Sequence, residues 1–367
     1  MNPQDELNEK LSRVRGYLDA KNLHGVFLSK QSNFSWVTGG CENRVAITSE
    51  LGAATIFVSR DRICVIANNI EAPRLRQEEV DELDIEVLDY PWYQENLRDD
   101  IIRELAGEWG VASDTGFSGT GKLDREFDEL KYSLTEPEVD RYKWLGRNCS
   151  LVIEKVCTEV KQEEAESEVA ARLAFEAMKA NITPTVILIA ADDRTLHFRH
   201  PLPTEKKVKE VLMVIFGGRR WGLIASLTRV VHFGEPGPEL IKKHKAACTV
   251  DATLILNSRA GAPTGEVLQK SIDAYKALGF PDEWQLHHQG GPTGYDGRCY
   301  RVAPGEQRAI QHNQAVAWNP SIAGAKSEDT ILCTSEPAEV LTPCHQWPTT
   351  QYEHAGMAIS RPDIFVL

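Results

Sequence analysis

The chain has 367 residues and a formal net charge of −13, with a pI near 5.3. This acidic balance argues against nucleic-acid backbones and anionic membrane surfaces as partners, because both attract basic patches. It favours a small-molecule or peptide ligand. The length suits two domains of unequal size.

The eight cysteines are scattered along the chain without C-x-x-C pairs. Such a pattern is typical of buried free thiols in a reducing compartment. The N-terminal segment lacks the charged and apolar regions of a signal peptide, and no 18-residue apolar run occurs. We therefore expect a cytoplasmic protein that does not enter the membrane.

The first third of the sequence predicts a mixed α/β domain. Leu7, Leu11, Val14 and Leu18 recur at helical spacing and indicate an opening amphipathic helix. The elements expected after it are a strand at 25–29, a hairpin of 53–59 and 62–68, a helix at 70–80, a strand at 85–90, a helix at 94–107 and a short strand at 110–113.

The rest of the sequence predicts an α+β domain. Pro137 lies in the first turn of a predicted helix, with acidic residues where the helix dipole favours them. We place the domain junction near 133, which gives domains of 1–133 and 134–367. The expected helices are 137–160, 164–180, 238–256 and 264–278, and the expected strands are 184–190, 211–217, 228–234, 315–320 and 329–334. Helices that cover one face of a strongly curved antiparallel sheet would give this domain its layers.

Four segments, in this order, carry a family resemblance: LHFRHP at 196–201, GL-x₃-LTR-x₃-FGEP at 222–236, HHQGGPTGYDGR at 287–298 and NPSIAGAKSEDT at 319–330. Together they resemble the creatinase/aminopeptidase P/methionine aminopeptidase family, whose catalytic domain has the pita-bread fold. The resemblance implies an N-terminal creatinase-like domain followed by a pita-bread domain. It also implies a homodimer, in which Arg44 of one subunit contributes to the partner's site.

The family holds a dinuclear metal centre with two aspartates eleven residues apart, a histidine and two glutamates. The matching positions here are Ile215, Ser226, His287 or His288, Asn319 and Glu328. Isoleucine has no lone pair for a cation, and a serine hydroxyl is a poor ligand without charged neighbours. Two potential ligands are too few for a dinuclear site, so we predict that the protein uses no metal and no other cofactor.

Creatinase is the member of the family that works without a metal, and its resemblance assigns catalysis to His197 and Glu328. A histidine with a pKa near 6.5 can serve as base and then as acid. Adjacent residues of a strand point to opposite faces, so only one of His287 and His288 would face the site. Spacing to the following glycines favours His288 as the catalytic partner, whereas spacing to Arg298 favours His287.

The remaining candidates are substrate-binding residues. Arg298 and Arg229 are possible donors to a developing oxyanion, although Arg229 would serve equally well as a brace for Asp329. A small organic substrate would occupy the former metal cavity, lined by Ile215, Ser226, Asn319 and whichever of the two histidines is not catalytic.

These inferences lead to three hypotheses. The first is a metal-independent hydrolase of a small non-protein C–N bond in an amide, amidine or ring, with a related elimination left open. The second is an Xaa-Pro-type metallopeptidase whose metal site is rebuilt from other residues. The third is a non-catalytic pita-bread binding protein, as some such domains in chromatin-associated proteins are.

Overall fold

The computed structural model describes residues 2–108, 110–117, 119–354 and 356–367. Two compact units make up the chain. The first comprises residues up to Lys131 together with Thr135–Glu138, and the second comprises Tyr132–Leu134 and Val139–Leu367. The junction predicted near 133 lies within residues 132–138, which alternate between the two units.

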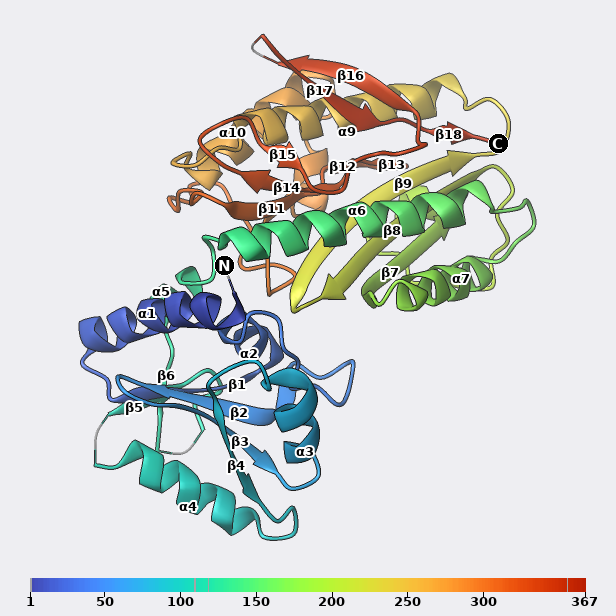
Figure 1. The fold of residues 1–367 in the computed structure, drawn as a ribbon. Coiled ribbons are helices and arrows are strands. Elements are labelled where there is room, and N and C mark those ends of the chain that lie inside the picture. The colour runs from blue at the N-terminus through green and yellow to red at the C-terminus, as the bar shows by residue number, and fades with distance from the viewer. Residues whose placement is uncertain (1, 109, 118, 355) are drawn as a thin grey trace. The chain divides into compact units, whose positions relative to one another are not determined.

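The N-terminal unit is built on a six-stranded sheet of order β4-β3-β2-β1-β5-β6 (Figure 1). Helices α1 and α4 lie on opposite faces of this sheet. The leucines and the valine of the predicted opening helix are buried on α1. The elements are α1 (Pro3–Lys21), β1 (Gly25–Lys30), α2 (Gln31–Val37), β2 (Leu51–Ser59), β3 (Ile63–Asn68), α3 (Ala72–Arg74) with a π-helical turn (Leu75–Glu79), β4 (Glu86–Tyr90), α4 (Glu95–Ala106), β5 (Val111–Ser113), β6 (Gly121–Lys122) and α5 (Arg125–Glu129).

The C-terminal unit contains two four-stranded sheets, β18-β9-β8-β7 and β10-β11-β14-β15. Its elements are α6 (Glu136–Thr158), α7 (Glu166–Lys179), β7 (Thr183–Ala191), α8 (Arg194–His197), β8 (Val211–Arg220), β9 (Leu223–His232), α9 (Pro238–Asn257), α10 (Thr264–Ala277), a 3₁₀ turn (Glu283–Leu286), β10 (Gly290–Pro292), β11 (Gln314–Trp318), β12 (Ser321–Ile322), β13 (Ala325–Lys326), β14 (Asp329–Cys333), β15 (Glu339–Val340), β16 (Thr349–His354), β17 (Met357–Pro362) and β18 (Phe365–Val366).

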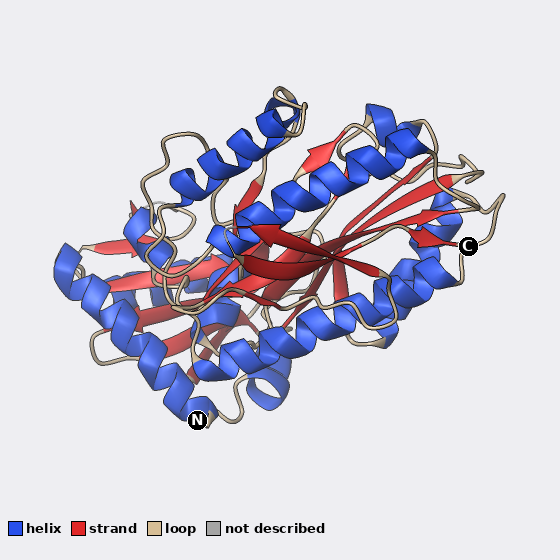
Figure 2. Ribbon diagram, turned by 90° about the horizontal axis from the view of Figure 1, so that it is seen from above, coloured by secondary structure: helices blue, strands red, loops and turns tan. Residues whose placement is uncertain are grey.

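The two sheets meet where β9 runs beside β14. The Thr228 amide donates to the Glu328 carbonyl at 3.0 Å, and the Ser226 amide donates to Thr330 Oγ1 at 2.8 Å. The sheets therefore continue into each other as one curved layer, with helices outside the strands (Figure 2). This arrangement confirms the predicted α+β class with a helix-covered, curved antiparallel sheet.

The β8–β9 hairpin aligns Ile215 and Ser226, two positions singled out in the sequence, with Thr228. Its turn consists of Trp221 and Gly222, which both have positive φ angles (52° and 77°), as the tightest hairpin turns require. Ile215 pairs with Thr228, and Ser226 pairs with Gly217. Because side chains alternate along a strand, Ile215, Ser226 and Thr228 share one face of the hairpin. Strand β9 begins five residues before the strand predicted at 228–234.

A buried ion network ties four elements of the C-terminal unit together. Arg361 of β17 pairs with Asp251 of α9 at 2.6 Å and with Asp329 of β14 at 2.5 Å. Arg229 of β9 pairs with Asp329 at 3.1 Å. All four side chains are fully or almost fully buried, so each charge depends on its neighbours for compensation.

The structure gives two further results on the chain as a whole. All eight cysteines are free thiols. None of the helices in the described ranges is both long enough and apolar enough to cross a membrane.

Candidate functional site

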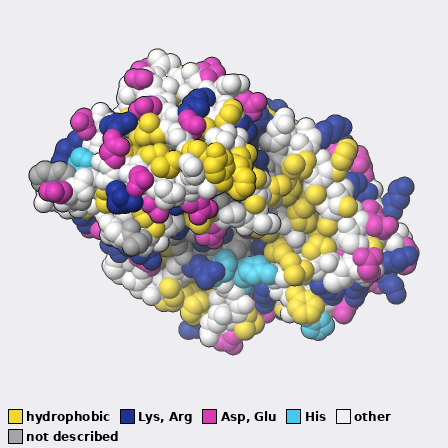
Figure 3. All heavy atoms as spheres, turned by 90° about the horizontal axis from the view of Figure 1, so that it is seen from below, with side chains coloured by type: hydrophobic (Ala, Val, Ile, Leu, Met, Phe, Trp, Pro, Cys, Tyr) yellow, Lys and Arg dark blue, Asp and Glu magenta, His cyan; other side chains and the backbone are white. Residues whose placement is uncertain are grey.

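Three histidines meet in the C-terminal unit, and we call His200, His287 and His288 the histidine cluster. One ring nitrogen from each lies within 4.8 Å of the others. His287 Nε2 and His200 Nε2 are 3.2 Å apart, and the ring centroids of His287 and His288 are 4.7 Å apart. Histidine side chains gather on one face of the molecule, beside Lys or Arg side chains (Figure 3).

Polar contacts between distant segments bring the cluster together. Arg199, next to His200, forms an ion pair with Glu283 in the 3₁₀ turn that precedes His287. Ser321 Oγ lies 3.1 Å from His287 Nδ1. Tyr275 holds this serine, because its hydroxyl accepts from the Ser321 amide at 2.9 Å. The cluster is thus fixed through side chains rather than through one regular element.

Gln289 extends the same support. It accepts a hydrogen bond from the Tyr275 hydroxyl at 2.9 Å, and its Nε2 donates to the His287 carbonyl at 2.6 Å. Both residues are buried. The backbone that carries the two adjacent histidines is therefore anchored to α10.

Glu328 is a buried carboxylate held by two partners. Its Oε2 lies 2.8 Å from Lys326 Nζ, with both side chains 4% exposed, and it accepts from Thr228 Oγ1 at 2.7 Å. Burial alone would raise the pKa of Glu328, but the Lys326 charge and these hydrogen bonds hold it below its ordinary value. The carboxylate is therefore ionised at neutral pH.

The imidazoles of the cluster are neutral at the same pH. Burial lowers the pKa of His287, and the Lys326 charge adds to the shift. Burial and the Arg298 charge lower the pKa of His288 to about 4. The pKa of His200 is lowered by burial and by Lys326, while Glu328 opposes the shift. Neutral imidazoles among cations can accept a proton or bind a ligand through a lone pair.

Arg298 supplies a second cation beside the cluster. Its Nη1 donates to the Gly291 carbonyl at 2.7 Å and to the Ala317 carbonyl at 2.6 Å, which joins β10 to β11. Its side chain is partly buried, and burial lowers its pKa. Its charge contributes to the lowered pKa of His288, so this predicted site residue does lie in the neighbourhood of the cluster.

Asn319 also lies beside this region. Its amide donates to the Gln289 carbonyl at 3.1 Å, and its side chain is buried. Within the described residues its Oδ1 has no hydrogen-bond partner. A buried acceptor of this kind is available to a ligand.

The structure places the other predicted residues elsewhere. His197 ends α8, is exposed, and has a ring contact with Phe198. Arg229 braces β9 against Asp329 at 3.1 Å, which matches the alternative considered for it. Arg44 pairs with Glu42 in the N-terminal unit.

The expectation that only one of His287 and His288 could face the site is wrong. It assumed that both belong to a strand, whereas β10 begins only at Gly290. The backbone before β10 is irregular. The planes of the two rings therefore make an angle of 41°, and both rings face the cluster. His200 joins them from the segment that also holds His197, but the sequence offered no reason to choose it, because its contact with His287 spans 87 positions.

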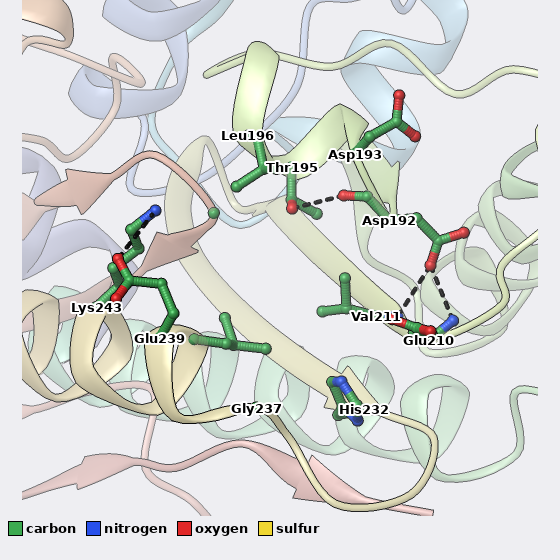
Figure 4. Close-up of a pocket in the computed structure, with 12 residues that line it drawn as sticks. Asp192, Asp193, Thr195, Leu196, Glu210, Val211, His232, Gly237, Glu239 and Lys243 are labelled. Carbon is green, nitrogen blue, oxygen red and sulfur yellow. Dashed lines mark hydrogen bonds and ion pairs between the residues drawn. The ribbon is translucent and has the colours of Figure 1, made fainter.

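A separate cavity of about 320 Å³ opens near α8 and the start of α9 (Figure 4). The Asp192 carboxylate on its wall accepts from the Glu210 amide at 2.8 Å, and Lys243 pairs with Glu239 at 3.7 Å. Leu196, Val211 and Leu240 add apolar surface. These polar groups are thus paired with one another, and none of the candidate residues lines the cavity.

Comparison with known families decides the assignment. The model of metallopeptidase family M24 matches residues 141–335, which is more than half of the chain. The protein belongs to metallopeptidase family M24. The pita-bread resemblance inferred from the four segments is thereby confirmed.

Relatives and solved structures extend over nearly the whole chain. An Xaa-Pro dipeptidase of Pyrococcus furiosus is 18% identical over 352 residues, covering 92% of this chain and 98% of the relative. The structure of an Xaa-Pro dipeptidase from Bacillus anthracis aligns with a TM-score of 0.78 at 17% identity, covering 98% and 100% of the two chains. The N-terminal domain of the FACT complex subunit SPT16 from chickpea aligns with a TM-score of 0.72 at 10% identity, covering 93% and 97%. The fold is therefore shared by dipeptidases and by the N-terminal domain of a FACT complex subunit.

The dinuclear metal centre implied by the family does not fit the residues present. Ile215 is 3% exposed and packs in an apolar cluster with Met213, Val230 and Ile364. The Glu328 carboxylate already forms an ion pair with Lys326 Nζ at 2.8 Å. An apolar side chain and a lysine ammonium in these positions exclude a pair of closely spaced dications.

Proposed function

We propose that this M24 protein hydrolyses the C–N bond of a small, carboxylate-bearing substrate of the Xaa-Pro dipeptide type. The observation that carries the proposal is a cluster of neutral imidazoles among cations, in an otherwise acidic chain. The charges of Lys326, Arg298 and Arg301 all bear on the cluster, whereas the chain as a whole carries −13.

The local charge balance favours an anionic substrate. Glu328 neutralises one of the three cations, which leaves an excess of two positive charges around the histidines. A dipeptide presents one free carboxylate close to its scissile bond. Cations in a partly buried setting attract such a group more strongly than cations in bulk water do. The names of the Pyrococcus and Bacillus relatives support the same substrate class.

The residues of the cluster can divide the proton transfers of hydrolysis. His200 is the exposed member and is the one able to take a proton from an attacking water molecule. His287 lies 3.2 Å away and can pass a proton to or from it. General acid–base catalysis of this kind contributes roughly 10²–10⁴-fold to the rate. Lys326 or Arg298 would stabilise the developing oxyanion.

The test is a panel of Xaa-Pro dipeptides assayed by release of proline, each paired with its C-terminal amide. We expect cleavage of the free dipeptides and a higher KM for the amides, because the amides lack the carboxylate. His200→Ala should lower kcat by about 100-fold or more, while His312→Ala, an exposed histidine outside the cluster, should match the wild type. Equal cleavage of dipeptides and amides would contradict the role of the cations.

A second candidate function assigns catalysis to the residues predicted from the sequence instead of to the histidine cluster. A metal-independent hydrolase acting on a small non-protein amide, amidine or ring C–N bond is favoured by the loss of the dinuclear ligands, above all at Ile215. Cleavage of such compounds with no cleavage of dipeptides would support it. In this reading His197 and Glu328 keep their predicted catalytic roles, and His197→Ala would abolish turnover.

The homodimer and the contribution of Arg44 from a partner subunit remain parts of both proposals, and the absence of a cofactor remains part of the second. Sedimentation at several protein concentrations tests the dimer. No hydrolysis of either substrate panel would leave the protein with the non-catalytic binding function.

A further inference from the structure

The histidine cluster has the arrangement of a ligand set for a single metal ion. We propose that His200, His287 and His288 bind one divalent transition-metal ion such as Zn²⁺, with a fourth position open to solvent or substrate. This mononuclear site differs from the dinuclear centre of the family, which requires carboxylates that Ile215 and Ser226 do not provide.

The spacing of the ring nitrogens supports the proposal. Zn–N bonds of about 2.0–2.1 Å in a tetrahedral arrangement place two ligand nitrogens about 3.3 Å apart. The Nε2 atoms of His200 and His287 are 3.2 Å apart. The third nitrogen lies within 4.8 Å of both, so a small rotation of the His288 ring would complete the set.

The surroundings of two of the rings also match those of metal ligands. A ligating histidine usually uses its second ring nitrogen in a hydrogen bond that fixes the ring. His287 does so, since its Nδ1 lies 3.1 Å from Ser321 Oγ, which leaves Nε2 directed at His200. His288 Nδ1 is buried and has no hydrogen-bond partner among the described residues, and an unpaired buried nitrogen requires an explanation such as a bound ion.

The site is held in place and yet accessible. The Arg199–Glu283 ion pair fixes His200 relative to the 3₁₀ turn, and the Tyr275–Ser321 contact of 2.9 Å fixes the support of His287. His200 is exposed, so an ion can enter from its side. Three histidines with an open fourth position are the ligand set of catalytic zinc sites, whereas structural sites are closed.

Neighbouring cations set the expected strength of binding. Lys326 opposes a dication, but the Glu328 carboxylate 2.8 Å from its Nζ offsets its charge. Arg298 is directed at two backbone carbonyls. Arg301 is exposed and therefore screened by solvent. We expect binding that is weaker than in a closed structural site and that tightens when Arg301 is replaced by alanine.

The inference deepens the proposed hydrolysis and rests on it only for its catalytic meaning, because binding is measured without substrate. With an ion bound, the facing lone pairs of His200 and His287 would serve as ligands, and the ion would activate the attacking water in place of His200. The full-length protein is stripped with a chelator and titrated with Zn²⁺ in competition with a chromophoric chelator. Parallel titration with Co²⁺ reports coordination geometry through its visible absorption bands. The variants are His200→Ala, His288→Ala, Ser321→Ala and Arg301→Ala, and the control is His197→Ala, which lies in the same segment outside the cluster.

We expect one Zn²⁺ per chain in the wild type and in His197→Ala, with Co²⁺ bands of a tetrahedral site. Affinity should fall by about 100-fold or more without His200 or His288, and by about 10-fold without Ser321. Thermal melts check that each variant is folded, and exposed His200 is the safest substitution in this respect. No binding at micromolar Zn²⁺, or equal binding by wild type, His200→Ala and His288→Ala, would overturn the proposal.

The dipeptide panel separates this inference from the proposed function. If one Zn²⁺ binds at the cluster and no dipeptide is cleaved, the metal site stands and the proposed hydrolysis fails. If the stripped protein cleaves dipeptides and takes up no Zn²⁺, the hydrolysis stands and the metal site fails.

Discussion

Replacing Lys326 with methionine tests how Glu328 is kept charged in the interior. The variant keeps most of the side-chain volume but removes the ammonium 2.8 Å from the carboxylate. With an effective dielectric constant of about 20, two charges at 2.8 Å attract each other by about 6 kcal/mol. Breaking a buried pair usually costs about 3–5 kcal/mol. Because Thr228 Oγ1 still donates to Glu328 at 2.7 Å, we expect a loss near the lower end, about 3 kcal/mol.

Urea unfolding of the wild type, Lys326→Met, Glu328→Gln and the double variant measures this coupling. The double variant should lose less stability than the sum of the two single variants, because each single change leaves one buried group without its partner. Strictly additive losses, or a Lys326→Met loss below about 0.5 kcal/mol, would refute the reasoning.

The same pair fixes the sign of a pH effect. The folded protein holds the pKa of Glu328 below its ordinary value of 4.5. The ion pair therefore stabilises the protein above pH 4.5, and this stabilisation is lost as the pH falls through the lower pKa of the folded state. Without Lys326, burial raises the pKa of Glu328 and favours protonation. The stability difference between wild type and Lys326→Met should therefore be largest near pH 7 and should shrink toward pH 4.

Two other substitutions have definite expected outcomes. Arg361→Met removes the cation that pairs with Asp251 and Asp329. We expect the free energy of unfolding to fall by about 3–5 kcal/mol and the Tm by about 10 °C. The control Arg103→Ala, at an exposed ion pair, should leave the Tm unchanged. Ile215→Asp puts a carboxylate into an apolar cluster, so it should destabilise the protein without creating metal-stimulated cleavage, since Ser226 remains; a gain of Mn²⁺-stimulated activity would contradict this reading.

Much of the fold could be predicted because its signals are local. Apolar periodicity identified α1 and placed α4, α6, α7, α9 and α10 within a few residues of their observed ends, and alternating or apolar runs placed most long strands. The C-terminal hairpin of β16 and β17 was missed. Its exposed and polar residues give no apolar pattern, and Arg361 reads as a surface residue although it is fully buried. An ion network between distant elements leaves no local signal in the sequence.

The candidate site was predictable only in part, for the same reason. Glu328 and Arg298 were found through motifs, and the structure places both by the cluster. The choice between His197 and His200 could not be made from the sequence, since the two lie three positions apart. The neighbouring Arg199–Glu283 ion pair distinguishes them. It joins residues 84 positions apart and positions His200 beside His287.

Arg361 also has a consequence for how the domain reaches its folded state. It lies outside residues 141–335, the stretch that carries the family match, yet its guanidinium is the counter-charge of both Asp251 and Asp329. A fragment cut at the edge of the family match would keep these two aspartates in the core of α9 and β14 without that cation. Intermediates in which β17 has not yet docked share this defect, and long-range contacts of this kind form late and slowly. The last hairpin is thus the step at which we expect aggregation to compete with folding.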